Sequence, residues 1–208
     1  IAAGMGKLGY KSRPQSITQK QATAAVGQSR LMNIYETHFS RYQRMVSQVL
    51  VTRDDLRHRQ RFLNALNTLL ALLELGIVPI INENDTVVVD EIQFGDNDNL
   101  SALITNLIEA DLLIVLTDID GLCDADPRIH PDAKCIPLIE DVDRDMGDIV
   151  GDTAGGTTVG GMVSKVEAAQ KASRFGIPTV IASGKREGVL HQILKGKQVG
   201  TLILPKME

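Results

Sequence analysis

The sequence predicts an α/β fold built on a mainly parallel sheet with helices on both faces. Three short segments are rich in Ile, Val and Leu: residues 77–81, 112–116 and 179–182. Strands that are buried on both faces have this composition. Segments with helical spacing of their apolar residues separate them. The chain has 208 residues, 43% of them hydrophobic, which is enough to enclose a core in one domain. This alternation of strand and helix indicates a mainly parallel sheet.

The first half of the chain contains two predicted helices, each followed by a strand. Apolar residues recur at helical spacing over Ser16–Tyr35, and the apolar stretch Met45–Val51 follows as a strand. A long helix comes next, with Asp54 or Asp55 as its N-cap and Gly76 at its end. Its apolar stripe comprises Phe62, Leu66, Leu69, Leu70 and Leu73.

The second half repeats this alternation. The predicted elements are a two-stranded ribbon across Thr86–Phe94, helices near Asn99–Ile108, Met162–Phe175 and Val189–Leu194, and strands at Leu112–Leu116, Thr179–Ala182 and Thr201–Leu204. Residues 120–137 and 151–156 form the longer irregular stretches. Because no internal repeat or long linker interrupts the pattern, we expect one domain.

Composition argues against several classes of function. The net charge of −4, the absence of Trp and the lack of a basic stripe argue against a nucleic-acid partner. No apolar run reaches the roughly 18 residues of a membrane span, and the first residues do not resemble a signal peptide, so a cytoplasmic enzyme is expected. Cys123 and Cys135 have no neighbouring His pair or Cys-x-x-Cys motif, and we predict free thiols rather than zinc ligands.

Two polar clusters follow apolar segments and are candidates for one shared pocket. Asp96–Asn99 places two carboxylates and two amides in four consecutive positions, and Asn82–Asp85 directly follows a predicted strand. Unpartnered carboxylates are costly to bury, so these groups should face solvent, a metal or a polar ligand. The alternative interpretation of Asp96–Asn99 is a helix N-cap with its neighbours.

The stretch Gly155–Lys165 is the best candidate for binding phosphate. Its glycines allow backbone N–H groups to approach an anion, and Lys165 adds a full positive charge in the first turn of the predicted helix. A surface loop before an ordinary helix is the alternative. Thr117-Asp118, at the end of an apolar strand, could hold a ribose or the polar edge of a nucleotide, or could form a simple turn. Gly4–Gly9 matches the spacing of a dinucleotide fingerprint, but no strand precedes it in this sequence.

Several motifs together resemble the glutamate 5-kinases of the amino acid kinase family. They are Ile80–Asp85, Phe94–Ala102, Leu116–Asp118, Asp126–Arg128 and Gly160–Lys165. The resemblance implies a three-layer αβα sandwich and phosphorylation of the side-chain carboxylate of L-glutamate by ATP with Mg²⁺, the first step of proline synthesis. It also implies a homo-oligomer, a dimer or tetramer, and inhibition by proline.

The resemblance also implies roles for individual residues. Asp85 and Asn97 would hold glutamate, aided by Asn82 and Asp96. Lys165 would neutralise the transferring phosphoryl group, and Asp98 would orient the catalytic lysines or the metal. ATP would contact Thr117, Asp118, Val159, Gly160, Gly161, Met162, Val163, Ser164 and Lys165. The glutamate-binding part would comprise about residues 1–110 and the ATP-binding part about residues 111–208 of one amino acid kinase domain, 1–208.

The sequence departs from the family pattern in three places. The family's first strand, early lysine and Ser-Gly loop precede the segment that matches Ile1 onward, so we expect an N-terminally incomplete domain. Val159 stands where relatives commonly have Thr. The C-terminal domain of many bacterial members, which resembles RNA-modification enzymes, is not in this sequence. Two alternatives stay open: a non-catalytic module that senses nucleotides or amino acids, and a related kinase acting on acetylglutamate, aspartate, carbamate or a nucleoside monophosphate.

Overall fold

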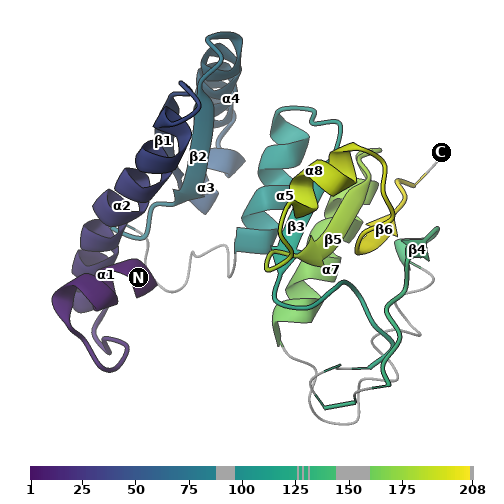
Figure 1. Ribbon diagram of the computed structural model, residues 1–208. Coiled ribbons are helices and arrows are strands. Elements are labelled where there is room, and N and C mark those ends of the chain that lie inside the picture. Colours follow the sequence, from purple (N-terminus) through teal and green to yellow (C-terminus); the bar gives the residue numbers. More distant parts are fainter. Residues whose placement is uncertain (88–96, 126, 128, 131, 144–159, 207–208) are drawn as a thin grey trace. The chain divides into compact units, whose positions relative to one another are not determined.

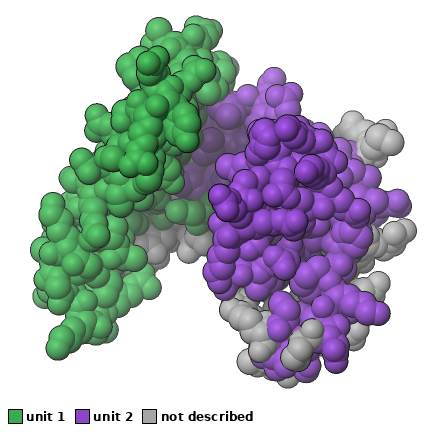
Figure 2. All heavy atoms as spheres, in the orientation of Figure 1, with its two compact units in different colours: residues 1–97 green, residues 98–208 purple. Residues whose placement is uncertain are grey.

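The chain folds into two compact units, Ile1–Asn97 and Asp98–Glu208 (Figures 1 and 2). The structure, a computed structural model, describes all residues except 88–96, 126, 128, 131, 144–159 and 207–208. Each unit has its own sheet, one of two strands and one of four. Three strand pairs are parallel and one is antiparallel, so the predicted α/β class with mainly parallel strands is confirmed. From residue 88 onward, the predicted ribbon lies outside the described residues, as does the predicted loop 151–156.

The first unit consists of helices arranged around a parallel pair of strands. Its elements are α1 (Ala2–Leu8), α2 (Ile17–Ser40), β1 (Val46–Val51), α3 (Arg53–Arg57), α4 (Arg59–Glu74) and β2 (Val78–Glu83). The strand register runs from Val46 opposite Val78 to Val51 opposite Glu83. The carboxyl ends of both strands therefore lie at the same edge, where the polar residues after β2 begin.

Helix α1 packs closely on α2 at Gly4, the first glycine of the run that has the spacing of a dinucleotide fingerprint. A Cβ atom at Gly4 would lie 1.9 Å from the carbonyl oxygen of Thr23 on α2, and a Cβ at Gly27 would lie 2.9 Å from the Gly4 nitrogen. Only glycine permits this separation of the two backbones. Gly4 therefore serves helix packing, and the run Gly4–Gly9 lies in helix α1 and its C-cap.

The prediction of one long helix after β1 is wrong about where the helix begins and about its being continuous. It begins with the short helix α3, and Thr52, not Asp54 or Asp55, is the N-cap. The Thr52 hydroxyl accepts a hydrogen bond from the Asp55 backbone N–H, and the Asp55 carboxylate accepts one from the Thr52 N–H at 2.8 Å. This reciprocal pair is a capping box. At His58 the backbone is extended, which ends α3 and lets α4 begin as a separate helix.

The second unit is a four-stranded sheet with helices on both faces. Its elements are α5 (Asn97–Leu107, whose first residue belongs to the first unit), β3 (Leu113–Thr117), β4 (Leu138–Ile139), α7 (Gly160–Ser173), β5 (Thr179–Ser183), α8 (Val189–Leu194) and β6 (Thr201–Ile203). The strand order is β3-β5-β6-β4. Only β5 and β6 pair in the antiparallel sense. Among the described residues, no helix has both the length and the apolar composition needed to cross a membrane.

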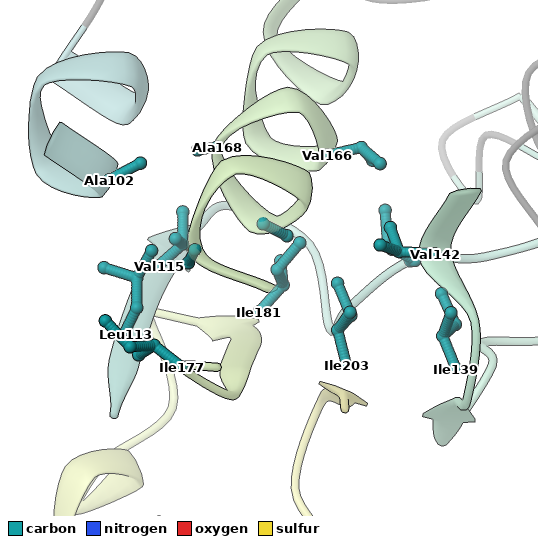
Figure 3. Close-up of a cluster of buried hydrophobic side chains, with 13 residues drawn as sticks. Ala102, Leu113, Val115, Ile139, Val142, Val166, Ala168, Ile177, Ile181 and Ile203 are labelled. Atoms are coloured by element: carbon teal, nitrogen blue, oxygen red, sulfur yellow. The ribbon is translucent and has the colours of Figure 1, made fainter. Parts of the chain in front are cut away.

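Alternate residues of β5 contribute to the cores on opposite faces of this sheet. Ile181 belongs to the large core that α5 and α7 cover, together with Ala102 and Ala168, whereas Val180 and Ala182 pack with Val189 of α8. Figure 3 shows side chains of β3, β5 and β6 on the same side of the sheet as α7. The unit therefore has helix, sheet and helix layers, as predicted.

The loop between β3 and β4 is held together by a disulfide between Cys123 and Cys135. The prediction of free thiols is thus wrong. The chain turns back on itself between them: the backbone N–H of Asp124 donates to the Lys134 carbonyl, and the Asp124 carboxylate accepts from the Lys134 N–H. These bonds place the cysteines opposite each other in an antiparallel bridge. Sequence spacing could not indicate that return.

Candidate functional site

The polar residues after β2 form a compact turn in the first unit. Asn82 lies in the last part of β2, and its side-chain oxygen accepts a hydrogen bond from the Glu83 N–H at 2.9 Å. The Asn84 N–H donates to the Val51 carbonyl, which joins the turn to the end of β1. Asp85 follows with a side chain that is 23% exposed, and its Oδ2 lies 4.0 Å from the backbone nitrogen of Ile1. The turn thus presents a partly accessible carboxylate beside the start of α1.

Thr117 and Asp118 lie at the carboxyl end of β3, as the sequence predicts. The Thr117 hydroxyl donates to the Asp118 carboxylate at 3.3 Å, and its carbonyl accepts from the Gly184 N–H at 2.8 Å. Gly184 directly follows β5, which runs parallel to β3 with Ser183 opposite Thr117. The carboxyl ends of two adjacent parallel strands therefore meet here, in the position where open α/β sheets bind ligands.

The first turn of α5 and the N-terminal half of α7 are joined by an ion pair. Lys165 Nζ lies 2.8 Å from Asp98 Oδ2, and the Ser164 hydroxyl donates to the same oxygen at 2.7 Å. The Lys165 and Asp98 side chains are 16% and 19% exposed. Two donors on one carboxylate oxygen define the position of the ammonium group more narrowly than a lone surface ion pair would.

Lys165 lies deeper in its helix than the sequence pattern suggested. Helix α7 begins at Gly160, so Lys165 is beyond the first turn rather than within it. The helix dipole acts mainly within the first turn. The positive charge that this site offers to an anion therefore comes chiefly from the ammonium group itself, which retains two further N–H donors beside the one directed at Asp98.

The other predicted residues fall into four groups. Asn97 is exposed at the first position of α5. Met162 and Val163 are half-buried in α7, and Met162 packs against the large core. Gly160 and Gly161 open that helix. Asp96 and Val159 lie outside the described residues, as do Asp126 and Arg128.

One contact beside this site was missed in the sequence. Lys171, in the last turn of α7, donates a hydrogen bond to the side-chain oxygen of Asn99, the residue after Asp98. No local pattern relates the two, because they come from different helices and meet only through packing. Across the described part of the chain, no three His, Cys, Asp or Glu side chains converge as a metal-ion site would require.

The sequence matches the amino acid kinase family over residues 1–183. It is 56% identical over 208 residues to a protein of Geobacter metallireducens named glutamate 5-kinase, and 49% identical over 205 residues to one of Methylococcus capsulatus with the same name. These alignments cover 100% and 99% of this chain but only 56% and 55% of the relatives. The chain thus spans little more than half the length of these curated relatives.

Solved structures share the fold at low sequence identity. A carbamate kinase from Giardia lamblia bound to AMP-PNP superposes with a TM-score of 0.66 at 18% identity, covering 99% of this chain and 79% of that one. An isopentenyl phosphate kinase gives a TM-score of 0.62 at 17% identity, covering 96% and 78%. At such identities the likeness concerns the fold alone.

Proposed function

The chain belongs to the amino acid kinase family, and from this premise we propose that it transfers the γ-phosphoryl group of ATP to the side-chain carboxylate of L-glutamate. Its identity to proteins named glutamate 5-kinase supports this choice of substrate. The product would be glutamyl 5-phosphate, an acyl phosphate that enters proline synthesis. The observation that carries the proposal is the Lys165 ammonium group held 2.8 Å from Asp98.

The reaction joins two anions, and the site residues suit that requirement. A carboxylate oxygen attacks the γ-phosphorus, the bond from phosphorus to the β–γ bridging oxygen breaks, and ADP leaves with that electron pair. The nucleophile is already deprotonated, so no general base is needed. Catalysis then depends on in-line placement and on compensation of negative charge. Lys165 would supply the compensating charge at the transferring phosphoryl group.

Asp98 would act as an orienting residue for Lys165. Its carboxylate accepts from both Ser164 and Lys165, which leaves the ammonium a narrow range of positions. An ammonium on a four-carbon chain otherwise samples many rotamers, and fixing it costs about 1.5–2 kcal/mol of side-chain entropy. The ion pair would meet that cost before the substrates bind.

The two substrates would use different groups of residues. Asp85 and Asn97, with Asn82 and Asp96, would bind the amino and carboxyl groups of glutamate. Thr117, Asp118 and the segment 159–165 would bind ATP. Mg²⁺ would arrive on the nucleotide, because Mg²⁺ is generally held by phosphate oxygens and few protein ligands. We further propose that residues up to about 110 serve mainly glutamate and those from about 111 serve mainly ATP.

Glutamate-dependent release of ADP by the complete gene product, with Mg²⁺ present, tests the proposal. Hydroxylamine in the same reaction should trap the acyl phosphate as glutamyl 5-hydroxamate, and the fragment ions of that product distinguish the side-chain carboxylate from the α-carboxylate. Acetylglutamate, aspartate, carbamate and a nucleoside monophosphate serve as competing acceptors. A higher kcat/KM with any of them would reassign the substrate. Binding of ATP and glutamate without turnover would instead support a sensing module.

We also propose that the protein is a cytoplasmic homo-oligomer, either a dimer or a tetramer, and that proline inhibits it. Light scattering of the purified protein would give the assembly. Titration of proline into the glutamate assay would test inhibition, with a rise in the glutamate KM expected if proline competes for the same pocket.

A further inference from the structure

Helices α5 and α7 are linked by two adjacent contacts, and the proposed reaction uses only one of them. Lys165 and Ser164 hold Asp98, whereas Lys171 donates to the side-chain oxygen of Asn99. Both helices also contribute small residues to one core: Ala102 of α5 and Ala168 of α7 are almost fully buried in it. Figure 3 shows Ala102 directed toward the α7 side of this core. The Lys171 contact thus joins two helices that contribute to the same core.

The placement of Lys171 calls for an explanation beyond solvation of a surface charge. Lysine is seldom buried without a partner, yet both Lys171 and Asn99 are half-buried. A cation near the N-terminal turn of α5 opposes that helix's dipole, so the contact gains nothing from α5 electrostatically. The first turn of a helix also has N–H groups without intrahelical partners and is prone to fraying. A tether at Asn99 would restrain the turn that carries Asp98.

We infer that Lys171 is a positioning residue: by holding Asn99, it fixes the first turn of α5 so that the Asp98 carboxylate stays aligned with Lys165. This inference rests on the proposed kinase function for its effect on turnover. Lys171 does not touch the reacting groups. The alternative is a purely structural role, because a cation in the last turn of α7 also stabilises that helix.

The comparison of Lys171→Met with Lys171→Arg and Arg174→Met distinguishes the two roles. Arg174, just after α7, pairs with the Asp143 carboxylate at 3.6 Å. Lys171→Met should lower kcat roughly ten- to a hundredfold, the loss expected for a misplaced catalytic group, with little change in either KM. Lys171→Arg, which can still donate to Asn99, should recover most of that loss, and Arg174→Met should keep wild-type kcat.

A second variant protects the test against misfolding. Asn99→Ala breaks the same contact from α5 and should lower kcat like Lys171→Met, and the double variant should show no further loss, as expected for groups that act as a unit. Unchanged kcat in Lys171→Met or in Asn99→Ala would overturn the inference. The inference would also be overturned if kcat fell only in proportion to the loss of Tm and fell equally in Arg174→Met.

Amide hydrogen exchange separates this inference from the proposed function. Peptides covering residues 97–101 should exchange faster in Lys171→Met than in the wild type, whereas Arg174→Met should leave their exchange unchanged. If the wild-type protein does not phosphorylate glutamate, the proposed function fails while this measurement still reports on the tether. If exchange at the start of α5 is the same in all three proteins, the inference fails even when the kinase is active.

Discussion

Lys165 Nζ lies 2.8 Å from Asp98 Oδ2, although the two residues are 67 positions apart in the sequence. The pair is partly shielded from solvent, and its carboxylate also accepts from Ser164. A partly buried ammonium group with a defined position is what stabilisation of a phosphoryl group requires. The first predictions concern this pair.

Lys165→Ala should lower kcat by about a hundred- to a thousandfold, in the range seen when one electrostatic group is removed from a transition state. The KM for ATP should change far less, because the other nucleotide contacts remain. Steady-state ADP release measures both parameters. Lys195→Ala, which removes an exposed lysine after α8, is the control. Equal losses in kcat and in ATP affinity would contradict the role assigned to Lys165.

Asp85→Ala should act mainly on glutamate. The Asp85 carboxylate is 23% exposed at the end of β2, where it could accept hydrogen bonds from the substrate's amino group. Its loss should raise the glutamate KM at least about tenfold with a smaller effect on kcat. Initial rates across glutamate concentrations, at saturating ATP, give the comparison. An unchanged glutamate KM would remove Asp85 from the substrate site.

The capping box at α3 should make stability depend on pH. Burial alone would raise the pKa of Asp55, but hydrogen bonds from Thr52 and the nearby Arg61 guanidinium outweigh it and hold the pKa below its ordinary value of 3.8. A lowered folded-state pKa contributes stability above the unfolded pKa and loses it as pH falls through the folded value. Asp55→Asn should therefore destabilise the protein at pH 7 by about 0.5–2 kcal/mol.

The difference between wild type and Asp55→Asn should shrink as pH falls below about 4, because the wild-type carboxylate is then protonated as well. Urea denaturation at pH 7 and at successively lower pH values tests this. A gap that stays constant over the whole range would show that the charge of Asp55 does not contribute.

Gly200→Ala should destabilise the second unit more than Gly196→Ala does. Both glycines have positive φ, 75° and 70°, so both substitutions carry the same backbone penalty, on the order of 1–2 kcal/mol. A Cβ at Gly200 would additionally lie 2.2 Å from the Ile181 carbonyl oxygen, whereas one at Gly196 meets no atom within 4 Å. The excess, about 1–3 kcal/mol for overpacking, is measured by urea unfolding of the two variants. Equal destabilisation by the two substitutions would mean that Gly200, just before β6, does not lie so close to β5.

The cystine between Cys123 and Cys135 can be tested chemically. The denatured wild-type protein, purified without reductant, should not react with iodoacetamide until it is reduced, and should then gain two carbamidomethyl groups. Cys135→Ser should react once without reduction, at Cys123. Addition of two carbamidomethyl groups to the unreduced wild type would instead show that both thiols are free.

The sequence alone determined the class of the fold and the approximate position of its main strands. The apolar composition of the segments at β3 and β5 predicts buried strands, because strands that are buried on both faces have Ile, Val and Leu at consecutive positions. The polar groups after β2 and β3 could also be located, because ligand-binding residues of parallel sheets follow the carboxyl ends of strands. These inferences need only local pattern.

The predictions were wrong where one local sequence pattern was compatible with two different structures. The sequence predicts one helix from Asp54 or Asp55 to Gly76, but the backbone at His58 is extended and the helix is divided there. Thr52, rather than the adjacent aspartates, provides the cap, because a capping box needs the Asp55 carboxylate at the third helical position. Lys165 is displaced from the first turn because the helix begins at Gly160, two residues before the predicted start.

Only the tertiary structure decided which distant groups meet. Asp98 with Lys165, Asn99 with Lys171, and Cys123 with Cys135 are brought together by the packing of α5 against α7 and by the return of a long loop. Periodicity specifies the face of a helix that is buried, but not which residue of another element it contacts. That pairing depends on how side chains pack in the shared core, to which α5 contributes Ala102 and α7 contributes Ala168.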